Sequence, residues 1–441
     1  MRSFQRVLFL PLIANRARAA LDIIPGATWT ATNTGEHIQA HGAGIIEENG
    51  VYYLIGEEKT DGTLFQAVNC YSSTNLIEWT FENQLLTRTE DDGDLGSNRI
   101  VERPKVIKND STGQYVMWLH IDSTDYGDAR VGVATGDTVC GTYEYRESFR
   151  PLGFQSRDIG LFKDDDGSAY LLTEDREYGT RIIKLTDDYL DVEEVTFGWE
   201  YFAESPALIK RGDNYFIFGS HLTGWSPNDN IYSTATSLSG PWTDWTEFAP
   251  VGTNTYTSQV NYVLPLGTNQ AIYLGDRWLP LEIDGTSVSL SWHDAWSVDV
   301  SSGTWADRGD VSIYEGENAT LSGGARTIEC SRCSGSIAAG YIGGDDDGDA
   351  DGTAVFDIDQ PSADRVTLDI KYLNGDTAPR YASVSVNGGE AQIVAFVSTN
   401  SHPDRAGDSS VHVDLDEGVN TVEISGAGAW GPDVDQVVVP V

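Results

Sequence analysis

The stretch Val51-Tyr-Tyr-Leu-Ile is the first of five similar segments that recur along the sequence. The others read Gln114-Tyr-Val-Met-Trp, Ala169-Tyr-Leu-Leu, Asn214-Tyr-Phe-Ile-Phe and Ala271-Ile-Tyr-Leu. Aromatic and β-branched residues that follow turn signals rich in Gly, Asp and Asn favour β-strands. The spacing of roughly 45 to 65 residues suits one four-stranded blade of a β-propeller per segment. The sequence therefore predicts an all-β fold with five blades.

The rest of the 441-residue chain predicts a second domain, because one hydrophobic core seldom organises this length. Residues 1–20 combine a basic start, a short apolar run and small residues at the end, which is typical of a signal peptide and predicts a secreted, extracellular protein. We assign residues 21–305 to the five-bladed propeller. Residues 306–441 contain short alternating strands and are assigned to a β-sandwich of the jelly-roll kind.

The composition is strongly acidic, with a formal net charge of -40. Such a charge excludes nucleic acid and anionic membranes as partners, whereas a neutral polysaccharide is compatible with it. A halophilic source would also explain the charge. We expect a monomer that acts on a polysaccharide.

The four cysteines are an even number in a chain predicted to be secreted, so disulfides are expected. Cys330 and Cys333 form a CxxC pair, which is compatible with a tight bridge, half of a zinc site or a redox pair. We favour the bridge, since no second close pair supplies zinc ligands and no helix is predicted after the motif. Cys70 and Cys140 then remain as the second pair.

Three carboxylates stand at the start of apolar runs that precede the recurring segments. They are Glu102, Asp158 and Glu204, one in each of three successive predicted blades. The innermost strands of a propeller surround a common channel, so residues far apart in sequence meet there. Glycoside hydrolysis needs such carboxylates, one to protonate the leaving oxygen and another group to activate water. One carboxylate of this kind would more often be a structural ion-pair partner, but three in equivalent positions favour a catalytic site.

The segment Ser156-Arg-Asp-Ile-Gly-Leu-Phe, together with Glu204-Ser-Pro, resembles glycoside hydrolase family 43 over most of residues 36–300. The resemblance implies a five-bladed propeller, inversion at the anomeric carbon and no cofactor for catalysis. It also implies that Glu204 is the general acid and that Asp158 orients it and raises its pKa by like charge.

The first predicted blade departs from the family. Most members carry an aspartate before a proline as general base, whereas this chain reads Ile38-Gln-Ala-His-Gly. The loss, with Ser258-Gln-Val-Asn, is similar to the exo-β-1,3-galactanase branch of the family and implies that Gln259 holds the attacking water. An unusual tautomer of Gln259, proton uptake by Glu102, and simple positioning of the water remain open, and His41 is a further candidate.

Galactose is distinguished by its axial 4-hydroxyl, so its recognition requires hydrogen-bonding groups beside an aromatic surface. Six residues near the predicted inner strands are expected to bind the substrate: His41, Glu57, Tyr126, Glu174, Thr223 and Trp225. For each, packing or a surface loop is an equally good explanation.

The C-terminal segment resembles carbohydrate-binding module family 35 over nearly all of residues 314–441. Its opening Tyr314-Glu-Gly-Glu-Asn and closing Gly431-Pro-Asp-Val-Asp-Gln-Val imply a structural calcium ion held by Glu315, Glu317 and Asp435. The resemblance also implies that four loop residues contact sugar, namely Tyr341, Arg380, Trp430 and Asp433.

These features together predict an inverting, exo-acting glycosidase that releases galactose from β-1,3-galactan, the backbone of arabinogalactan. An α-L-arabinofuranosidase or β-xylosidase is the alternative within the family, and the missing first-blade aspartate disfavours it. A non-catalytic propeller lectin is the alternative from another class. Its weakness is that a lectin needs no pair of carboxylates tuned to different pKa values.

Overall fold

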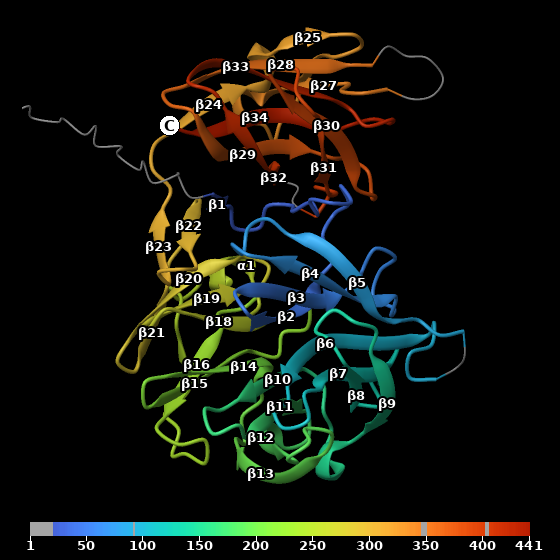
Figure 1. Ribbon diagram of the computed structural model, residues 1–441, viewed down its shortest axis with the longest axis vertical. Coiled ribbons are helices and arrows are strands. Elements are labelled where there is room, and N and C mark those ends of the chain that lie inside the picture. The colour runs from blue at the N-terminus through green and yellow to red at the C-terminus, as the bar shows by residue number, and fades with distance from the viewer. Residues whose placement is uncertain (1–20, 91–92, 345–350, 402–404) are drawn as a thin grey trace, which may run out of the picture.

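The computed structural model describes residues 21–90, 93–344, 351–401 and 405–441, so the predicted signal peptide lies outside the described residues. The regular secondary structure is almost entirely β-strand, and the C-terminal unit lies at one end of the molecule (Figure 1). Within the described ranges no helix is long and apolar enough to cross a membrane.

Residues 41–290 form five consecutive four-stranded antiparallel sheets. The first two contain β2 (His41–Glu48), β3 (Val51–Glu57), β4 (Ala67–Ser73) and β5 (Thr80–Thr87), then β6 (Arg99–Lys108), β7 (Tyr115–Ser123), β8 (Arg130–Gly136) and β9 (Glu144–Phe149). The third contains β10 (Ile159–Lys163), β11 (Ala169–Asp175), β12 (Gly179–Leu185) and β13 (Val192–Gly198). The last two contain β14 (Glu204–Arg211), β15 (Asn214–Ser220), β16 (Ile231–Ala235) and β17 (Thr246–Glu247), then β18 (Tyr262–Leu266), β19 (Gln270–Leu274), β20 (Leu279–Asp284) and β21 (Ser287–Leu290). A short helix, α1 (Asn254–Thr257), precedes the fifth sheet.

Each of these sheets contains one of the five recurring segments, as predicted, and the segment is its second strand. Each first strand contacts the first strand of the next sheet, and β18 also contacts β2. Hydrophobic clusters fill the spaces between neighbouring sheets, including the space between the fifth and the first. The strand β7 is buried at all but its last position because its sheet is covered on both faces. This is an arrangement of the five-bladed propeller type.

The C-terminal unit packs two sheets around a separate core. One has six strands: β24 (Val311–Glu315), β26 (Arg326–Glu329), β27 (Ile337–Gly340), β29 (Asp364–Leu373), β32 (Gly407–Leu415) and β34 (Asp433–Pro440). The other has five: β25 (Thr320–Ser322), β28 (Thr353–Gln360), β30 (Arg380–Val386), β31 (Gln392–Phe396) and β33 (Gly418–Gly426). Alternation of buried and exposed residues along β28 is the pattern of a strand with one face on the core.

A three-stranded sheet joins the two units. It pairs β1 (Asp22–Ile23) with β22 (Trp296–Asp299), which pairs in turn with β23 (Thr304–Asp307). The boundary expected between residues 305 and 306 falls inside β23, and the first strand of the C-terminal unit begins at Val311.

The N-terminal segment also binds the C-terminal unit directly. The Asp22 amide donates to Thr367 Oγ1 at 2.9 Å, and the Thr28 amide donates to the Asp408 carbonyl at 2.8 Å. Farther out, Arg365 Nη2 lies 2.6 Å from Glu78 Oε1. Because backbone groups make part of this contact, the two units are fixed to each other by more than flexible side chains.

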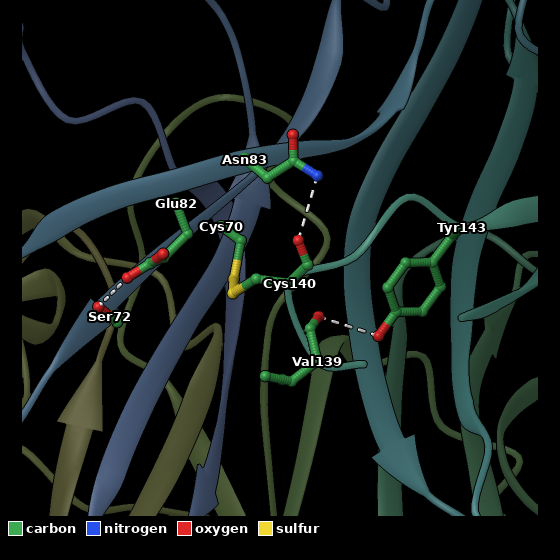
Figure 2. Close-up of a disulfide and its surroundings, with 7 residues drawn as sticks. All are labelled: Cys70, Ser72, Glu82, Asn83, Val139, Cys140 and Tyr143. Atoms are coloured by element: carbon green, nitrogen blue, oxygen red, sulfur yellow. Dashed lines mark hydrogen bonds between the residues drawn. A yellow bond between two sulfur atoms is a disulfide. The ribbon is translucent and has the colours of Figure 1, made fainter. Parts of the chain in front are cut away.

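Both cysteine pairs are disulfides, so the pairing of Cys330 with Cys333 and of Cys70 with Cys140 is confirmed. Figure 2 shows Cys70 on β4 bonded to Cys140, which lies in the loop between β8 and β9. The Asn83 side chain donates to the Cys140 carbonyl at 3.1 Å. The bond therefore ties the first sheet to the second.

Candidate active site

A cavity of about 310 Å³ opens where the five first strands begin. All four predicted catalytic residues line it: Glu102, Asp158, Glu204 and Gln259. The other lining residues are His41, Glu57, Arg103, His120, Tyr126, Arg157, Arg176, Gly224 and Trp225. The fold thus gathers residues that are more than two hundred positions apart in sequence.

Irregular backbone aims the key side chains into this cavity. The register shifts by a β-bulge between Glu102 and Lys105 in β6, and again between Glu204 and Ala207 in β14. Within these bulges Arg103 has φ 53° and Ser205 has φ 57°. Left-handed conformations are uncommon for residues other than glycine and cluster at functional sites, and a bulge re-aims the side chains beside it.

Arg103 connects the carboxylates to the predicted water-holding residue. Its Nε lies 2.9 Å from Asp158 Oδ1, and its Nη2 donates to Gln259 Oε1 at 2.6 Å. Its Nη1 donates to Ser205 Oγ at 2.5 Å and to Asn261 Oδ1 at 3.2 Å. A planar guanidinium can make these bonds at once because its donors point in fixed directions. Sequence reasoning missed Arg103, although the repeated Glu-Xaa-Pro at residues 102–104 and 204–206 marks its position.

Glu204 and Asp158 have pKa values driven apart. Burial and the nearby Asp158 carboxylate raise the pKa of Glu204 to about 7, against the opposing effect of Arg176, which forms an ion pair with it. Burial alone would raise the pKa of Asp158, but Arg103, together with His120 and Arg176, lowers that pKa below the ordinary value. One group is therefore protonated near neutral pH while its neighbour stays ionised.

Glu174 is fully buried and is not among the residues that line the cavity. Its Oε1 lies 2.5 Å from Nε of Arg176. Burial is the main reason that the pKa of Glu174 is raised to about 8, with a further contribution from Asp158. Glu174 thus stands behind Arg176, where it positions a cavity residue instead of facing the ligand directly.

On the first sheet, Glu57 is held as a carboxylate by several donors. It accepts a hydrogen bond from the Arg103 amide at 2.7 Å and pairs with Lys59 at 2.7 Å and with His41 at 3.4 Å. Burial opposes ionisation, but His41 and Lys59 bring the pKa of Glu57 to about 2. The same carboxylate raises the pKa of His41, so this histidine favours its charged form.

Gln259 is fixed on both sides of its amide. Its Oε1 accepts from Arg103, and its Nε2 donates to Ser220 Oγ at 2.7 Å. These partners define which end of the amide is oxygen and which is nitrogen. Gln259 is therefore placed in one orientation at the cavity wall.

The loop after β15 contributes the most exposed aromatic residue of the cavity. Trp225 lines the cavity and is 80% exposed, as suits a surface on which a sugar stacks. Thr223 does not line it. Its hydroxyl bonds within the loop, to the Ser226 carbonyl, and receives a hydrogen bond from Asn228 at 2.8 Å. Thr223 thus shapes the loop that carries Trp225.

In the C-terminal unit, the residues predicted to contact sugar lie together. The rings of Tyr341 and Trp430 are 6.0 Å apart in an edge-to-face arrangement. Arg380 Nη1 donates to the Gly431 carbonyl at 3.0 Å, next to Asp433. Burial raises the pKa of Asp433, and Arg380 opposes that effect.

Two of the predicted calcium ligands, Glu315 and Asp435, bond to the same residue: the Ser334 amide donates to Asp435 Oδ1 at 2.9 Å, and its hydroxyl donates to Glu315 Oε1 at 3.4 Å. Burial raises the pKa of Asp435 to about 6, and the negative charges of the two glutamates add to this. Oε2 of Glu315 and Oε2 of Glu317 are buried without a hydrogen-bond partner, which suits hard oxygen ligands. Across the described ranges, however, no three or more His, Cys, Asp or Glu side chains are arranged as a metal site.

Comparison with known proteins bears on both units. Residues 39–270 match the model of glycosyl hydrolases family 43, and residues 357–439 match a CBM13-like model described as the CBM13 domain of α-galactosidase. The C-terminal unit is thus a CBM13-like module. A search of curated proteins found no significant match.

Several solved structures are similar over both units. The exo-β-1,3-galactanase from Phanerochaete chrysosporium with galactose has 35% identity and a TM-score of 0.66, and the match covers 95% of this chain and 100% of that one. A variant of the same enzyme with β-1,3-galactotriose matches equally well. The exo-β-1,3-galactanase from Clostridium thermocellum has 26% identity and a TM-score of 0.62, with 95% and 100% coverage. The family model spans more than half of the chain, and its segment contains Glu102, Asp158, Glu204 and Gln259. The chain therefore belongs to glycosyl hydrolase family 43.

Proposed function

We propose that the protein is an exo-acting, inverting glycosidase that releases galactose from β-1,3-galactan, the backbone of arabinogalactan. The observation that carries the proposal is the pairing of Glu204, with a pKa of about 7, with Asp158, whose pKa is lowered. The similar structures named above include enzymes bound to galactose and to β-1,3-galactotriose. The five sheets would then close as a propeller around the cavity, with a jelly-roll module attached.

In this proposal Glu204 is the general acid. Its proton passes to the glycosidic oxygen as the bond to the anomeric carbon breaks. A water molecule attacks the opposite face of the sugar and releases its proton to solvent, from which Glu204 is reprotonated. Asp158 remains an anion, bound to Arg103 and to the Ser205 amide at 3.0 Å, and keeps Glu204 protonated by its charge.

Gln259 is proposed to orient the attacking water. Arg103 and Ser220 fix its amide, and each amide group retains capacity for one more hydrogen bond. Both carboxylate oxygens of Glu102 have a neighbouring side chain: Lys59 Nζ lies 3.7 Å from Oε1, and His120 Nδ1 lies 3.3 Å from Oε2. We assign Glu102 to the binding of sugar hydroxyls.

Product analysis on β-1,3-galactan tests this function. Thin-layer chromatography and early-time proton NMR should show α-galactose from the wild type and no sugar from Glu204→Gln. Glu247→Gln is the matched control, because Glu247 lies on the exposed outer strand of the same sheet and should leave hydrolysis unchanged. Release from arabinan or xylan instead of galactan would favour the alternative within the family. Binding of galactan without hydrolysis by the wild type would favour a lectin.

We further propose that the C-terminal module binds galactan in the manner of carbohydrate-binding module family 35. The adjacent rings of Tyr341 and Trp430, with Arg380 and Asp433 beside them, support this site. Trp430→Ala should weaken retention of the protein on insoluble galactan several-fold and leave hydrolysis of galactotriose unchanged, since stacking on one aromatic ring contributes about 1 kcal/mol or more. Unchanged retention in a pull-down would contradict this site.

Calcium in the module, secretion and a monomeric state complete the proposal. Glu315, Glu317 and Asp435 would hold the ion, which would tie the two ends of the module together. The even cysteine count, with both pairs bonded, supports an oxidising location.

A further inference from the structure

Two buried polar residues, one in the cavity wall and one bonded to it, have no role of their own in the chemistry described so far. His120 and Asp122 lie on β7 and are 1% and 0% exposed. They are two positions apart on a strand and so point to the same face, while Leu119 and Ile121 are buried in the hydrophobic core. Buried ionisable groups are costly unless they are paired, so their partners indicate their role.

Asp122 anchors the pair to the backbone. Its Oδ1 accepts hydrogen bonds from the amides of Ser123, Asp128 and Ala129 at 2.8 to 3.1 Å. Its Oδ2 lies 2.8 Å from Nε2 of His120. Burial would raise the pKa of Asp122, but His120 and these amides lower it below its ordinary value. The imidazole is thus oriented by a fixed anion.

The other ring nitrogen of His120 faces the cavity. Its Nδ1 is buried, lies 3.3 Å from Glu102 Oε2 and has no aligned hydrogen bond. Burial opposes protonation of His120, yet Asp122 and Glu102 raise its pKa to about 9, so it is a cation at neutral pH. His120 therefore lies between two carboxylates. Because Asp122 is anchored to the backbone, the imidazole that it orients also fixes the position of Glu102.

Glu102 is the group whose position is controlled. Glu102 on β6 is directly paired with His120 on β7, and Tyr126 donates a hydrogen bond to Glu102 Oε1 at 3.2 Å. We infer that Asp122 and His120 form a positioning pair that fixes the side chain of Glu102 so that it faces the bound galactose. The inference rests on the proposed function, in which Glu102 binds sugar hydroxyls. Neither residue is required to touch the reacting atoms.

A binding cycle in the Glu204→Gln background tests the inference, because that variant should bind β-1,3-galactotriose without cleaving it. Adding His120→Gln should weaken binding about tenfold by calorimetry, as expected when a hydrogen bond to a charged group is lost. Glu102→Gln should weaken binding at least as much. The two changes together should be no worse than Glu102→Gln alone, since a residue that acts through another is non-additive with it.

Asp122→Asn is the second variant, because it retains the backbone hydrogen bonds of Oδ1 and removes the anion beside His120. Asp122→Asn should weaken galactotriose binding as much as His120→Gln does. If His120→Gln fails to fold, Asp122→Asn tests the inference in its place. His221→Gln is the control: His221 bonds to Tyr201 at 2.8 Å and does not line the cavity, so binding should not change.

The pH dependence of binding distinguishes a positioning role of His120 from a purely structural role, because a purely structural role would not change it. The charged and titratable groups around Glu102 are His120, Lys59 and Tyr126, and Arg103 is its neighbour in sequence. The pKa of His120 is raised to about 9, so binding should weaken as the pH rises through about 9, and His120→Gln should remove this alkaline loss.

Losses that multiply in the combined variant, or unweakened binding by His120→Gln, would overturn the inference and leave the proposed function intact. Failure of Glu204→Gln alone to bind galactotriose would instead overturn the proposed function.

Discussion

Glu204 carries a pKa raised to about 7, with burial as the first cause and the charge of Asp158 as the second. A general acid works only while protonated, so kcat/KM should fall as the pH rises through about 7. Asp158→Asn removes the like charge and lowers the pKa of Glu204, which should move this alkaline limb to lower pH. A pH profile of galactotriose hydrolysis measures both. An alkaline limb in the same place in the variant would show that Asp158 does not tune the acid.

Single residues also mark how far sequence reasoning reaches. Glu204 and Asp158 were visible because a carboxylate at the start of an apolar strand is conspicuous in the sequence itself. Arg103 was not, because its partners Asp158, Gln259 and Ser205 come from three other sheets. The meaning of a basic residue depends on what the fold places around it, and periodicity contains no such information. Thr223 and Glu174 were predicted to line the site for the converse reason, since proximity in sequence to an inner strand does not fix where a side chain points.

Elements were easier to predict than residue roles. The recurring aromatic segments were identified as strands because both of their faces are buried, which leaves continuous apolar runs with turn residues between them. The bulges in β6 and β14 were not predicted, although Pro104 and Pro206 interrupt both runs. Proline lacks the amide that a regular ladder requires, so each marks the place where pairing changes register.

The bond between Cys70 and Cys140 stabilises the contact between the first two sheets. It closes a segment of 70 residues, whereas Cys330 and Cys333 are separated by only 3. In the loop-entropy model, stabilisation grows with the length closed, so Cys70→Ala/Cys140→Ala should lower the free energy of unfolding by about 4 kcal/mol. Cys330→Ala/Cys333→Ala should cost less, about 2 kcal/mol. Denaturant titration of both variants decides this, and equal losses would contradict the argument.

At the scale of the whole molecule, the module should respond to calcium. Ligand that binds only the folded state stabilises it by about 2.7 kcal/mol when its concentration is 100 times Kd. Chelation should therefore lower the Tm of the wild type, and calcium should restore it. Glu317→Gln should reduce this response, because Glu317 contributes one of the two unpartnered buried oxygens. A Tm that is insensitive to chelator and to added calcium would remove the ion from the proposal.

The division into two units was predicted from a change in sequence pattern near residue 305, but the contact between them was not. It depends on residues 21–30, which carry little pattern of their own and acquire their role from donors and acceptors on the opposite unit. Long-range hydrogen bonds of this kind have no local signature.

The segment between Asp22 and Thr30 has a consequence for modular engineering. It pairs with β22 on one side and bonds to Thr367, Asp408 and Ala395 on the other. The segment is therefore part of the interface between the N-terminal unit and the C-terminal module. If a foreign module were grafted after residue 310, this segment would lose its hydrogen-bond partners in the C-terminal module. A chimera in which only the C-terminal module is exchanged would therefore have a poorly matched interface. Exchanging residues 22–30 together with the module would preserve the interface.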